Sequence, residues 1–278
     1  MTIQSDDSGQ RFFLGDDLQD VDLSPLGSGS VAVFTTRSPD KENDKRNEDS
    51  AGLFALDDGS AVIVVADGCG GMPLGGEAAD LTIRAFEKTL AEITDPETLR
   101  PSILNALESA SAAIKGLGVG AASTIVVAEI RDQTVRTYHV GDSELLVVGN
   151  RGKLRFQTIS HSPVGYAVES GMLDEKGGML HEDRNVVSNL LGLDDMHIDI
   201  GPKIDMRQRD TLVLGSDGVF DNLRQAEVVE IIRKGPLREA ARGLKTACLQ
   251  RMSSNGGSTP CKPDDLTFAI FRLGQPTV

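Results

Sequence analysis

Four apolar runs in this chain have aspartate at one end, and this repetition limits what the chain can fold into. The runs are TLVLG before Ser216-Asp217-Gly218, VIVVA before Asp67-Gly68, TYHV before Gly141-Asp142, and LTFAIFRL directly after Asp264-Asp265. Short runs rich in β-branched residues predict buried strands, and Asp-Gly is a frequent turn where a strand ends. One turn would explain one example. Four examples indicate that carboxylates gather where several strands end.

The periodicity of the rest of the chain places strands in two blocks, each followed by helices. Strands are expected at 31–37, 51–67 (two strands around a turn at Asp57-Asp58-Gly59), 123–130, 135–140, 144–149, 153–159, 211–215 and 266–273. Helices are expected at 76–93, 97–118, 227–235 and 237–252. Consecutive strands joined by tight turns differ from regular βαβ alternation. The pattern therefore predicts an α+β protein in which antiparallel sheets pack face to face with helices outside.

Two stretches of the chain are less regular. Residues 1–28 are polar, and we expect a leader there with a short edge strand at Arg11–Leu14, followed by a single domain over 29–278. The mixed segment 160–200 predicts a short helix at 163–172 and a strand near Asn185–Leu191.

Charge and cysteine content narrow the class of protein. The formal net charge of −14 disfavours nucleic acid and anionic membranes as partners, and it fits a soluble protein or one whose carboxylates bind cations. The three cysteines, Cys69, Cys248 and Cys261, are odd in number and have no CxxC spacing, which favours a reducing compartment. With no signal peptide and no apolar run long enough to span a bilayer, we expect a cytoplasmic protein.

If neighbouring strands bring their ends together, a group of acidic residues converges at one edge of the sheets. The group consists of Glu48, Asp49, Asp67, Asp142, Asp217, Asp221, Asp264 and Asp265. Clustered carboxylates raise one another's pKa unless cations lie among them, and Mg²⁺ or Mn²⁺ would take such oxygen ligands. Gly68 would let a backbone carbonyl approach an ion closely. The alternative, isolated turn aspartates in an acidic structural protein, remains open on spacing alone.

Six short motifs follow one another along nearly the whole chain. They are RNEDS (46–50), VVADGCGG (64–71), GAAST (120–124), HVGDS (139–143), LGSDGVFD (214–221) and KPDDLTF (262–268). In this order they resemble the motifs of the metal-dependent type 2C protein serine/threonine phosphatases, bacterial members included. The resemblance implies a four-layer α-β-β-α sandwich, two antiparallel sheets flanked by helix pairs, with a catalytic domain over 29–278 and two Mg²⁺ or Mn²⁺ ions between the sheets.

The resemblance also implies roles for individual residues. The metal ligands would be Glu48, Asp67, Gly68 (through its carbonyl oxygen), Asp142, Asp217, Asp221 and Asp264. Asp67 would bridge the two ions, and the Gly68 carbonyl would join the first; Glu48, Asp217 and Asp264 would complete the second site. Asp142, Asp217 and Asp221 match a third, weaker metal site. Asp49 would hold metal-bound water. Asp264 is chosen over Asp265 because the family pattern is Asp-Asn-(Ile/Met)-(Thr/Ser).

Other positions depart from the family pattern. Asp44 stands where an arginine usually grips the substrate phosphate, and we expect Lys45, Arg46 or Arg37 to replace it. Met72 stands where a histidine is frequent, so the protein either uses another acid, for which His161 and His139 are the candidates, or relies on metal-bound water.

The resemblance implies a phosphatase that hydrolyses phosphoserine or phosphothreonine in a protein, using a metal-activated water, and that opposes a serine/threonine kinase. The altered positions leave an alternative: a phosphatase-fold module, weak or inactive in catalysis, that binds a phosphoprotein or partner. We expect neither nucleic acid nor membrane as a partner. Segment 160–200 matches a variable flap beside the site of family members.

Overall fold

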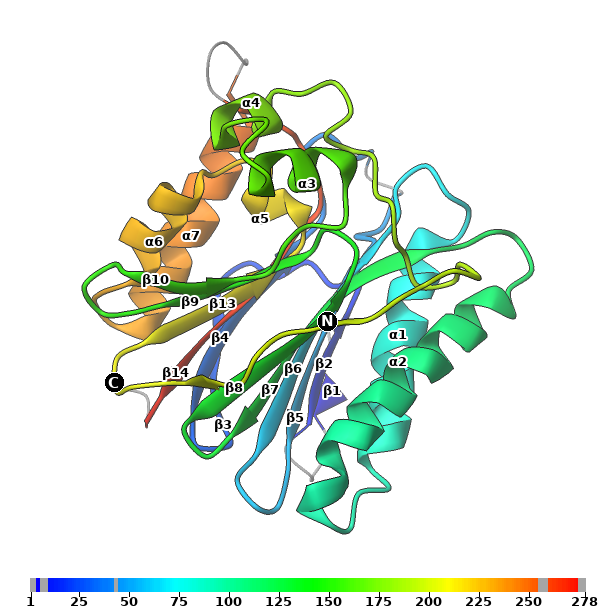
Figure 1. Cartoon of the computed structure of the whole chain (residues 1–278), viewed down its shortest axis with the longest axis vertical. Helices are drawn as coiled ribbons and strands as arrows, with labels where there is room; N and C mark the ends of the chain where they lie inside the picture. Colours follow the sequence, from blue (N-terminus) through cyan, green and yellow to red (C-terminus); the bar gives the residue numbers. More distant parts are fainter. Residues whose placement is uncertain (1–3, 6–9, 43–44, 255–259, 275–278) are drawn as a thin grey trace.

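The structure, a computed structural model, describes residues 4–5, 10–42, 45–254 and 260–274. Within these residues the strands form two antiparallel sheets (Figure 1). The first sheet contains β1 (Gln4–Ser5), β2 (Arg11–Leu14), β5 (Asp49–Ala55), β6 (Ala61–Gly68), β7 (Ser123–Arg131), β8 (Thr134–Val140), β11 (Asp199–Ile200) and β12 (Ile204–Asp205). The second contains, in spatial order, β10 (Leu154–Gln157), β9 (Glu144–Val148), β13 (Thr211–Gly215), β14 (Leu266–Leu273), β4 (Gly29–Thr36) and β3 (Asp22–Leu26).

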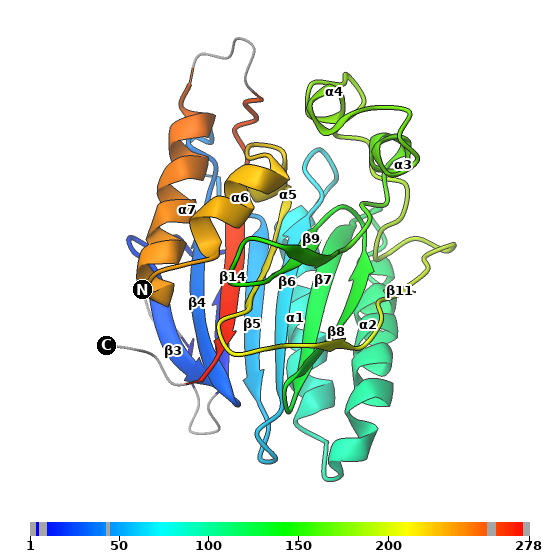
Figure 2. The same ribbon diagram turned by 60° about the vertical axis from the view of Figure 1, so that its left-hand side comes forward.

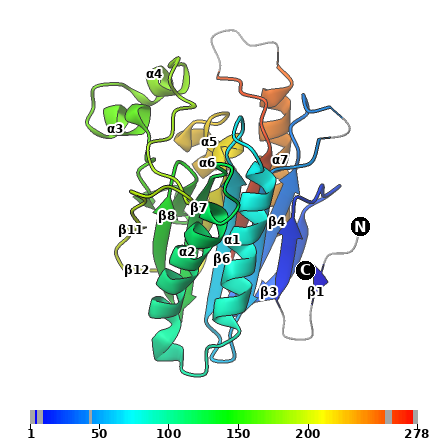
Figure 3. The same ribbon diagram turned by 90° about the vertical axis from the view of Figure 1, so that its right-hand side faces the viewer.

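Helices cover the outer faces of both sheets. The described helices are α1 (Gly75–Leu90), the 3₁₀ turn η1 (Pro96–Thr98), α2 (Leu99–Lys115), α3 (Pro163–Glu169), α4 (Glu175–Met179), α5 (Asp217–Phe220), α6 (Gln225–Ile232) and α7 (Leu237–Met252). Of these, α1 and α2 pack on the first sheet, and α6 and α7 pack on the second. Figure 3 shows α1 and α2 against the first sheet, and Figure 2 shows α6 and α7 on the opposite side of the molecule. The expected α-β-β-α sandwich is confirmed. Among the described residues, no helix combines the length and apolar character needed to cross a membrane.

The central strand β6 explains why its sequence is continuously apolar. Val62 and Val64 pack under the helices, whereas Ile63 and Val65 pack between the sheets. Alternate side chains of a strand point to opposite faces, so a strand covered on both faces needs apolar residues at every position. Asp67 is the first position at which this strand leaves the core.

The amphipathic pattern of the first helix is also confirmed. Ile83, Phe86 and Leu90 of α1 lie in the core cluster formed with the first sheet, and Ile93 packs against its edge. The third cluster joins α6 and α7 to the second sheet. The helices therefore cover the faces of the two sheets but not the ends of the strands, where polar groups can lie.

The expected polar leader needs correction. Strand β2, predicted at Arg11–Leu14, is present, and β3 adds to the second sheet within the same stretch. Phe12 packs under α1, and Phe13 packs between the sheets. The folded unit therefore begins well before residue 29, because Phe12 and Phe13 anchor β2 and Leu26 anchors β3 in the core.

Segment 160–200 forms a flap containing α3 and α4 (Figures 1 and 2). The predicted helix is present as α3. The strand predicted near Asn185–Leu191 is wrong: the segment there is a loop with a single antiparallel bridge between Leu191 and Ser123. Asn189 Nδ2 donates to the carbonyl of His197, and its Oδ1 accepts from His197 N, so side-chain bonds replace a strand ladder.

Candidate metal centre

The predicted carboxylates converge at one end of the sandwich. Asp49 begins β5 opposite Asp67 at the end of β6, and the loops after β8 and β13 bring Asp142 and Asp217 to the same place. Asp264 enters from the segment before β14. The negative charges of Asp49, Asp217, Asp264 and Asp142 all act on the pKa of Asp67, which confirms that they share one site.

Two of these carboxyl groups are held where they resist ionisation. Burial raises the pKa of Asp49 well above its usual range, and the nearby charge of Asp265 adds to this. Burial does the same to Asp67, helped by the charge of Asp49. Asp49 Oδ2 accepts a hydrogen bond from Ser216 Oγ at 2.8 Å, whereas its buried Oδ1 has no protein partner in the described chain. An acceptor oriented into a group of repelling carboxylates fits the hydrogen-bonding of a cation's water.

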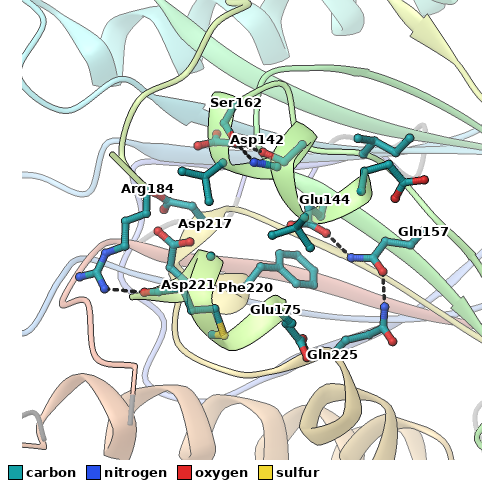
Figure 4. A pocket seen from close by; sticks show the side chains of 18 of the residues that line it. Asp142, Glu144, Gln157, Ser162, Glu175, Arg184, Asp217, Phe220, Asp221 and Gln225 are labelled. Atoms are coloured by element: carbon teal, nitrogen blue, oxygen red, sulfur yellow. Dashed lines mark hydrogen bonds between the residues drawn. The ribbon is translucent and has the colours of Figure 1, made fainter. Parts of the chain in front are cut away.

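The outer part of the site faces a cavity of about 440 Å³ beneath the flap (Figure 4). Asp142, Asp217 and Asp221 line it together with Glu144. Burial raises the pKa of Asp142, and it raises the pKa of Asp221 to about 6 and that of Asp264 to about 7. A cavity whose inner wall is acidic and whose outer wall is a flap suits a substrate bound next to cations.

Gly68 adds a backbone element to the site. A Cβ at this position would lie 2.2 Å from the carbonyl oxygen of Gly75 and 2.8 Å from that of Glu48. Gly68 N also donates to the Glu48 carbonyl at 3.1 Å. The close approach of three backbone segments explains the glycine, and it places the Gly68 carbonyl beside Asp67.

Substituting Gly68 by alanine should destabilise the protein and weaken metal binding. The new methyl group overlaps backbone atoms, which cannot rotate away as a side chain would, so overpacking of about 1–3 kcal/mol is expected. Thermal unfolding in EDTA and calorimetric Mn²⁺ titration would measure the two effects. Gly70→Ala is the matched control, because a Cβ at Gly70 meets no atom within 4 Å. Equal unfolding temperatures for the two variants would contradict the argument.

Two lysines that the motif analysis missed lie against the predicted ligands. Lys41 Nζ contacts Glu48 Oε2 at 2.7 Å and Asp265 Oδ2 at 2.6 Å. Lys262 Nζ contacts Asp217, and it lies 2.9 Å from Asp221 Oδ2 and 3.3 Å from Asp264 Oδ2. A sequence signal existed for Lys262. Pro263 forces the residue before it into an extended conformation, in which positions 262 and 264 share a side.

Asp265 differs from Asp264 because both of its carboxylate oxygens accept hydrogen bonds from other segments of the chain. Asp265 is buried, and its Oδ1 accepts from Ser38 N at 2.7 Å. Its Oδ2 accepts from Glu48 N at 2.6 Å as well as from Lys41. These bonds fasten the loop before β5 to the start of β14. Because its oxygens are taken by backbone donors and a lysine, Asp265 is a poorer candidate ligand than Asp264, in line with the choice made from sequence.

The polar contacts of the His161 side chain are with Gly141, Asn189 and Asp199, and none of these is a predicted catalytic residue or metal ligand. Its Nδ1 accepts from Gly141 N at 3.2 Å and from Asn189 Nδ2 at 2.8 Å, and its Nε2 lies 3.3 Å from Asp199 Oδ2. Burial lowers the pKa of His161. With two N–H donors on Nδ1, the neutral ring carries its proton on Nε2. His161 thus supports the loop that presents Asp142, and its predicted role as catalytic acid stays a prediction.

The hydrogen bonds of His161 also decide whether a nearby group of two histidines and an aspartate can bind a metal ion. His139, His161 and Asp199 lie close enough to one another to hold a metal ion. His161 Nε2 would have to lose its proton to act as a ligand while Nδ1 still accepts from two donors. A neutral imidazole cannot satisfy both demands, so the carboxylates form the better metal site.

The predicted phosphate-binding residues lie at the surface. Arg46 Nη2 donates to Asp80 Oδ2 of α1 at 2.8 Å, and Arg46 Nε donates to the Asn47 carbonyl at 3.1 Å. Lys45 is exposed. Asp44, the departure that motivated both predictions, is outside the described residues. Arg46 could bind phosphate only if its ion pair with Asp80 opened, so both roles stay predictions.

A different arginine reaches the cavity from the flap. Arg184 lines it, and its Nη1 donates to the Met179 carbonyl at 2.8 Å (Figure 4). Its charge also lowers the pKa of Asp221, against the larger effect of burial. The sequence offered no motif around Arg184, because its position depends on how the flap folds back over α5.

Cys69 is a poor candidate for a nucleophile. Burial and the charge of Asp67 raise the pKa of its thiol. Since the thiolate is the reactive form, a raised pKa disfavours this role. The chemistry of the site therefore depends on its carboxylates.

The chain is similar to a group of known proteins. Residues 40–247 match the family model described as Protein phosphatase 2C. The chain is 31% identical over 208 residues to a serine/threonine phosphatase, stp, of Listeria monocytogenes, covering 70% of this chain and 81% of that protein. It is 26% identical over 239 residues to protein phosphatase PhpP of Streptococcus pneumoniae, covering 82% of this chain and 92% of that protein. A solved serine/threonine phosphatase of S. agalactiae superposes with a TM-score of 0.74 at 25% identity, covering 88% of this chain and 99% of that chain. The chain belongs to the protein phosphatase 2C family.

Proposed function

We propose that the protein is a Mg²⁺- or Mn²⁺-dependent phosphatase that removes phosphate from phosphoserine or phosphothreonine in a protein substrate. The observation that carries the proposal is the convergence of carboxylates at one site, where burial and the charges of neighbouring aspartates raise the pKa values of Asp49, Asp67 and Asp142. A fold gains nothing from such a cluster unless cations offset it. The relatives named as serine/threonine phosphatases support the substrate class.

The donor set fits a pair of hard divalent ions. Asp67, Glu48, Asp217, Asp264 and the Gly68 carbonyl would hold them, all through oxygen, as these ions prefer. When bound, such a metal pair activates a water for attack on phosphorus and offsets charge on the phosphoryl oxygens.

The chain itself fixes the position of these groups. Ser123 Oγ donates to the Asp67 carbonyl at 2.9 Å and so holds the end of β6. Ser216 Oγ orients Asp49, whose free Oδ1 would accept from a water at the site. Residues of the flap line one side of the cavity, and Arg184 places a positive charge at its wall, where an anionic substrate would bind.

The direct test is phosphate release from phosphoserine and phosphothreonine peptides. Release is expected with Mn²⁺ and should cease in EDTA, whereas a phosphotyrosine peptide should be a poorer substrate. Tight peptide binding without release would favour the phosphoprotein-binding module instead. We further propose a cytoplasmic site of action opposite a serine/threonine kinase, consistent with the substrate class.

A further inference from the structure

Lys262 lies in the outer corner of the metal centre. Its ammonium group contacts Asp217 and lies 2.9 Å from Asp221 Oδ2 and 3.3 Å from Asp264 Oδ2. The lysine side chain is 13% exposed. One cation thus meets three carboxylates in a largely enclosed place, a geometry that an exposed lysine in solvent does not adopt.

The backbone around Lys262 is fixed to the element that carries two of these carboxylates. Lys262 N donates to Asn222 Oδ1 at 2.9 Å, and Asn222 Nδ2 donates back to the Lys262 carbonyl at 2.8 Å. Asn222 is fully buried, and it also donates to the Gly218 carbonyl of α5 at 3.0 Å. The lysine is therefore held against Asp217 and Asp221 by a built connection.

The corner needs a positive charge. Asp142, Asp217 and Asp221 line the same cavity wall, and the charge of Lys262 acts on Asp142 as well as on the residues it touches. Three carboxylates at this spacing repel unless a cation lies among them. Lys262 supplies that cation from within the chain.

We propose that Lys262 occupies the position of the third, weaker metal ion, so that this protein binds two divalent ions where its relatives with a vacant corner would accept three. Lys262 contacts each of the three carboxylates through Oδ2, and Asp264 Oδ1 accepts from Asp265 N at 2.9 Å. Lys262 is therefore a positioning residue that sets the number of bound ions. The inference rests on the proposed metal-dependent function.

The test compares the wild type with Lys262→Met, in which the side chain keeps a similar length and loses its charge. Calorimetric titration with Mn²⁺ should give two ions per wild-type chain and three per Lys262→Met chain. In EDTA, the unfolding temperature of Lys262→Met should fall on the order of 5–10 °C, because carboxylates are left without a counter-ion. Excess Mn²⁺ should restore most of this loss.

Two further variants make the result specific. Lys234→Met removes the same charge from an exposed lysine that pairs with Glu230 on the surface, and it should leave both measurements unchanged. Adding Asp221→Asn to Lys262→Met should return the count to two ions, because the third ion loses a ligand. Asp221→Asn alone should keep two, and this variant serves if Lys262→Met fails to fold.

The outcomes separate the inference from the proposed function. Three ions in the wild type, or two ions in a folded Lys262→Met chain with an unchanged unfolding temperature, would overturn the role of Lys262 and leave the phosphatase intact. If neither chain binds Mn²⁺, the metal-dependent function itself fails, and the inference with it.

Discussion

Replacing Asp67 by asparagine is expected to abolish Mn²⁺-dependent phosphate release. Asp67 is the carboxylate on which most of the others act, and it stands at the end of β6 opposite Asp49. Asparagine keeps the shape and one acceptor oxygen but cannot offer a negative charge to two ions. Mutation beyond the ligands of a metal site costs roughly 10–100-fold, so loss of a central ligand should lower kcat/KM for p-nitrophenyl phosphate by at least ~100-fold.

The variant should nevertheless fold. Removing one of several carboxylates lowers the electrostatic repulsion in the metal-free protein. In EDTA, the unfolding temperature of Asp67→Asn should therefore equal or exceed that of the wild type. Asp195→Asn, at an exposed loop position, is the matched control and should keep full activity. Wild-type turnover in folded Asp67→Asn would remove Asp67 from the metal centre. Absence of turnover in the wild type as well would favour a binding module.

The sequence predicted the centre of the site better than its surroundings. Asp67 and Asp217 follow apolar runs whose length and β-branched content identify buried strands, and the face-to-face packing of the two sheets that contain these strands then brings the aspartates together. Lys41 gave no comparable signal, and Lys262, although it begins the motif KPDDLTF, was not recognised as part of the site. A long flexible side chain can reach a site from outside any motif, and a lone lysine in sequence resembles an ordinary surface charge.

The flap and the amino-terminal strands were harder to predict for a different reason. Strand β3 (DLSPL) is short and contains a proline, which argues against a strand in the sequence, and its pairing with β4 makes it a strand. Asn185–Leu191 has strand-like composition, but Asn189 is tied by its side chain to His197 and His161. In both places tertiary contacts determine the local structure, and the secondary-structure propensity of the sequence does not predict such contacts.

Metal removal should destabilise the wild type strongly at neutral pH and weakly in acid. An ion that binds only the folded chain adds about 2.7 kcal/mol at a free concentration ~100 times its Kd. At roughly 2–4 °C per kcal/mol for a domain of this size, two ions should raise the unfolding temperature on the order of 10–20 °C at pH 7.5. The formal net charge of −14 adds a general repulsion that bound cations also reduce.

The direction of the pH effect follows from the raised pKa values of Asp49, Asp67, Asp142, Asp221 and Asp264. In the unfolded chain these groups lose their protons near pH 3.8, whereas the folded, metal-free chain keeps them to about pH 6 for Asp221 and about pH 7 for Asp264. Between those limits the folded state binds more protons, so these groups make the metal-free protein less stable as pH rises. Metal binding requires the ionised form, so its stabilisation grows over the same interval.

Unfolding temperatures measured with Mn²⁺ and with EDTA at pH 5.0 and pH 7.5 therefore test the site without any substrate. The difference between Mn²⁺ and EDTA should be large at pH 7.5 and small at pH 5.0, and Asp67→Asn should reduce it at the higher pH. A difference that is the same at both values of pH would mean that the ions bind elsewhere, because only ligands that titrate in this interval link metal affinity to pH in this way.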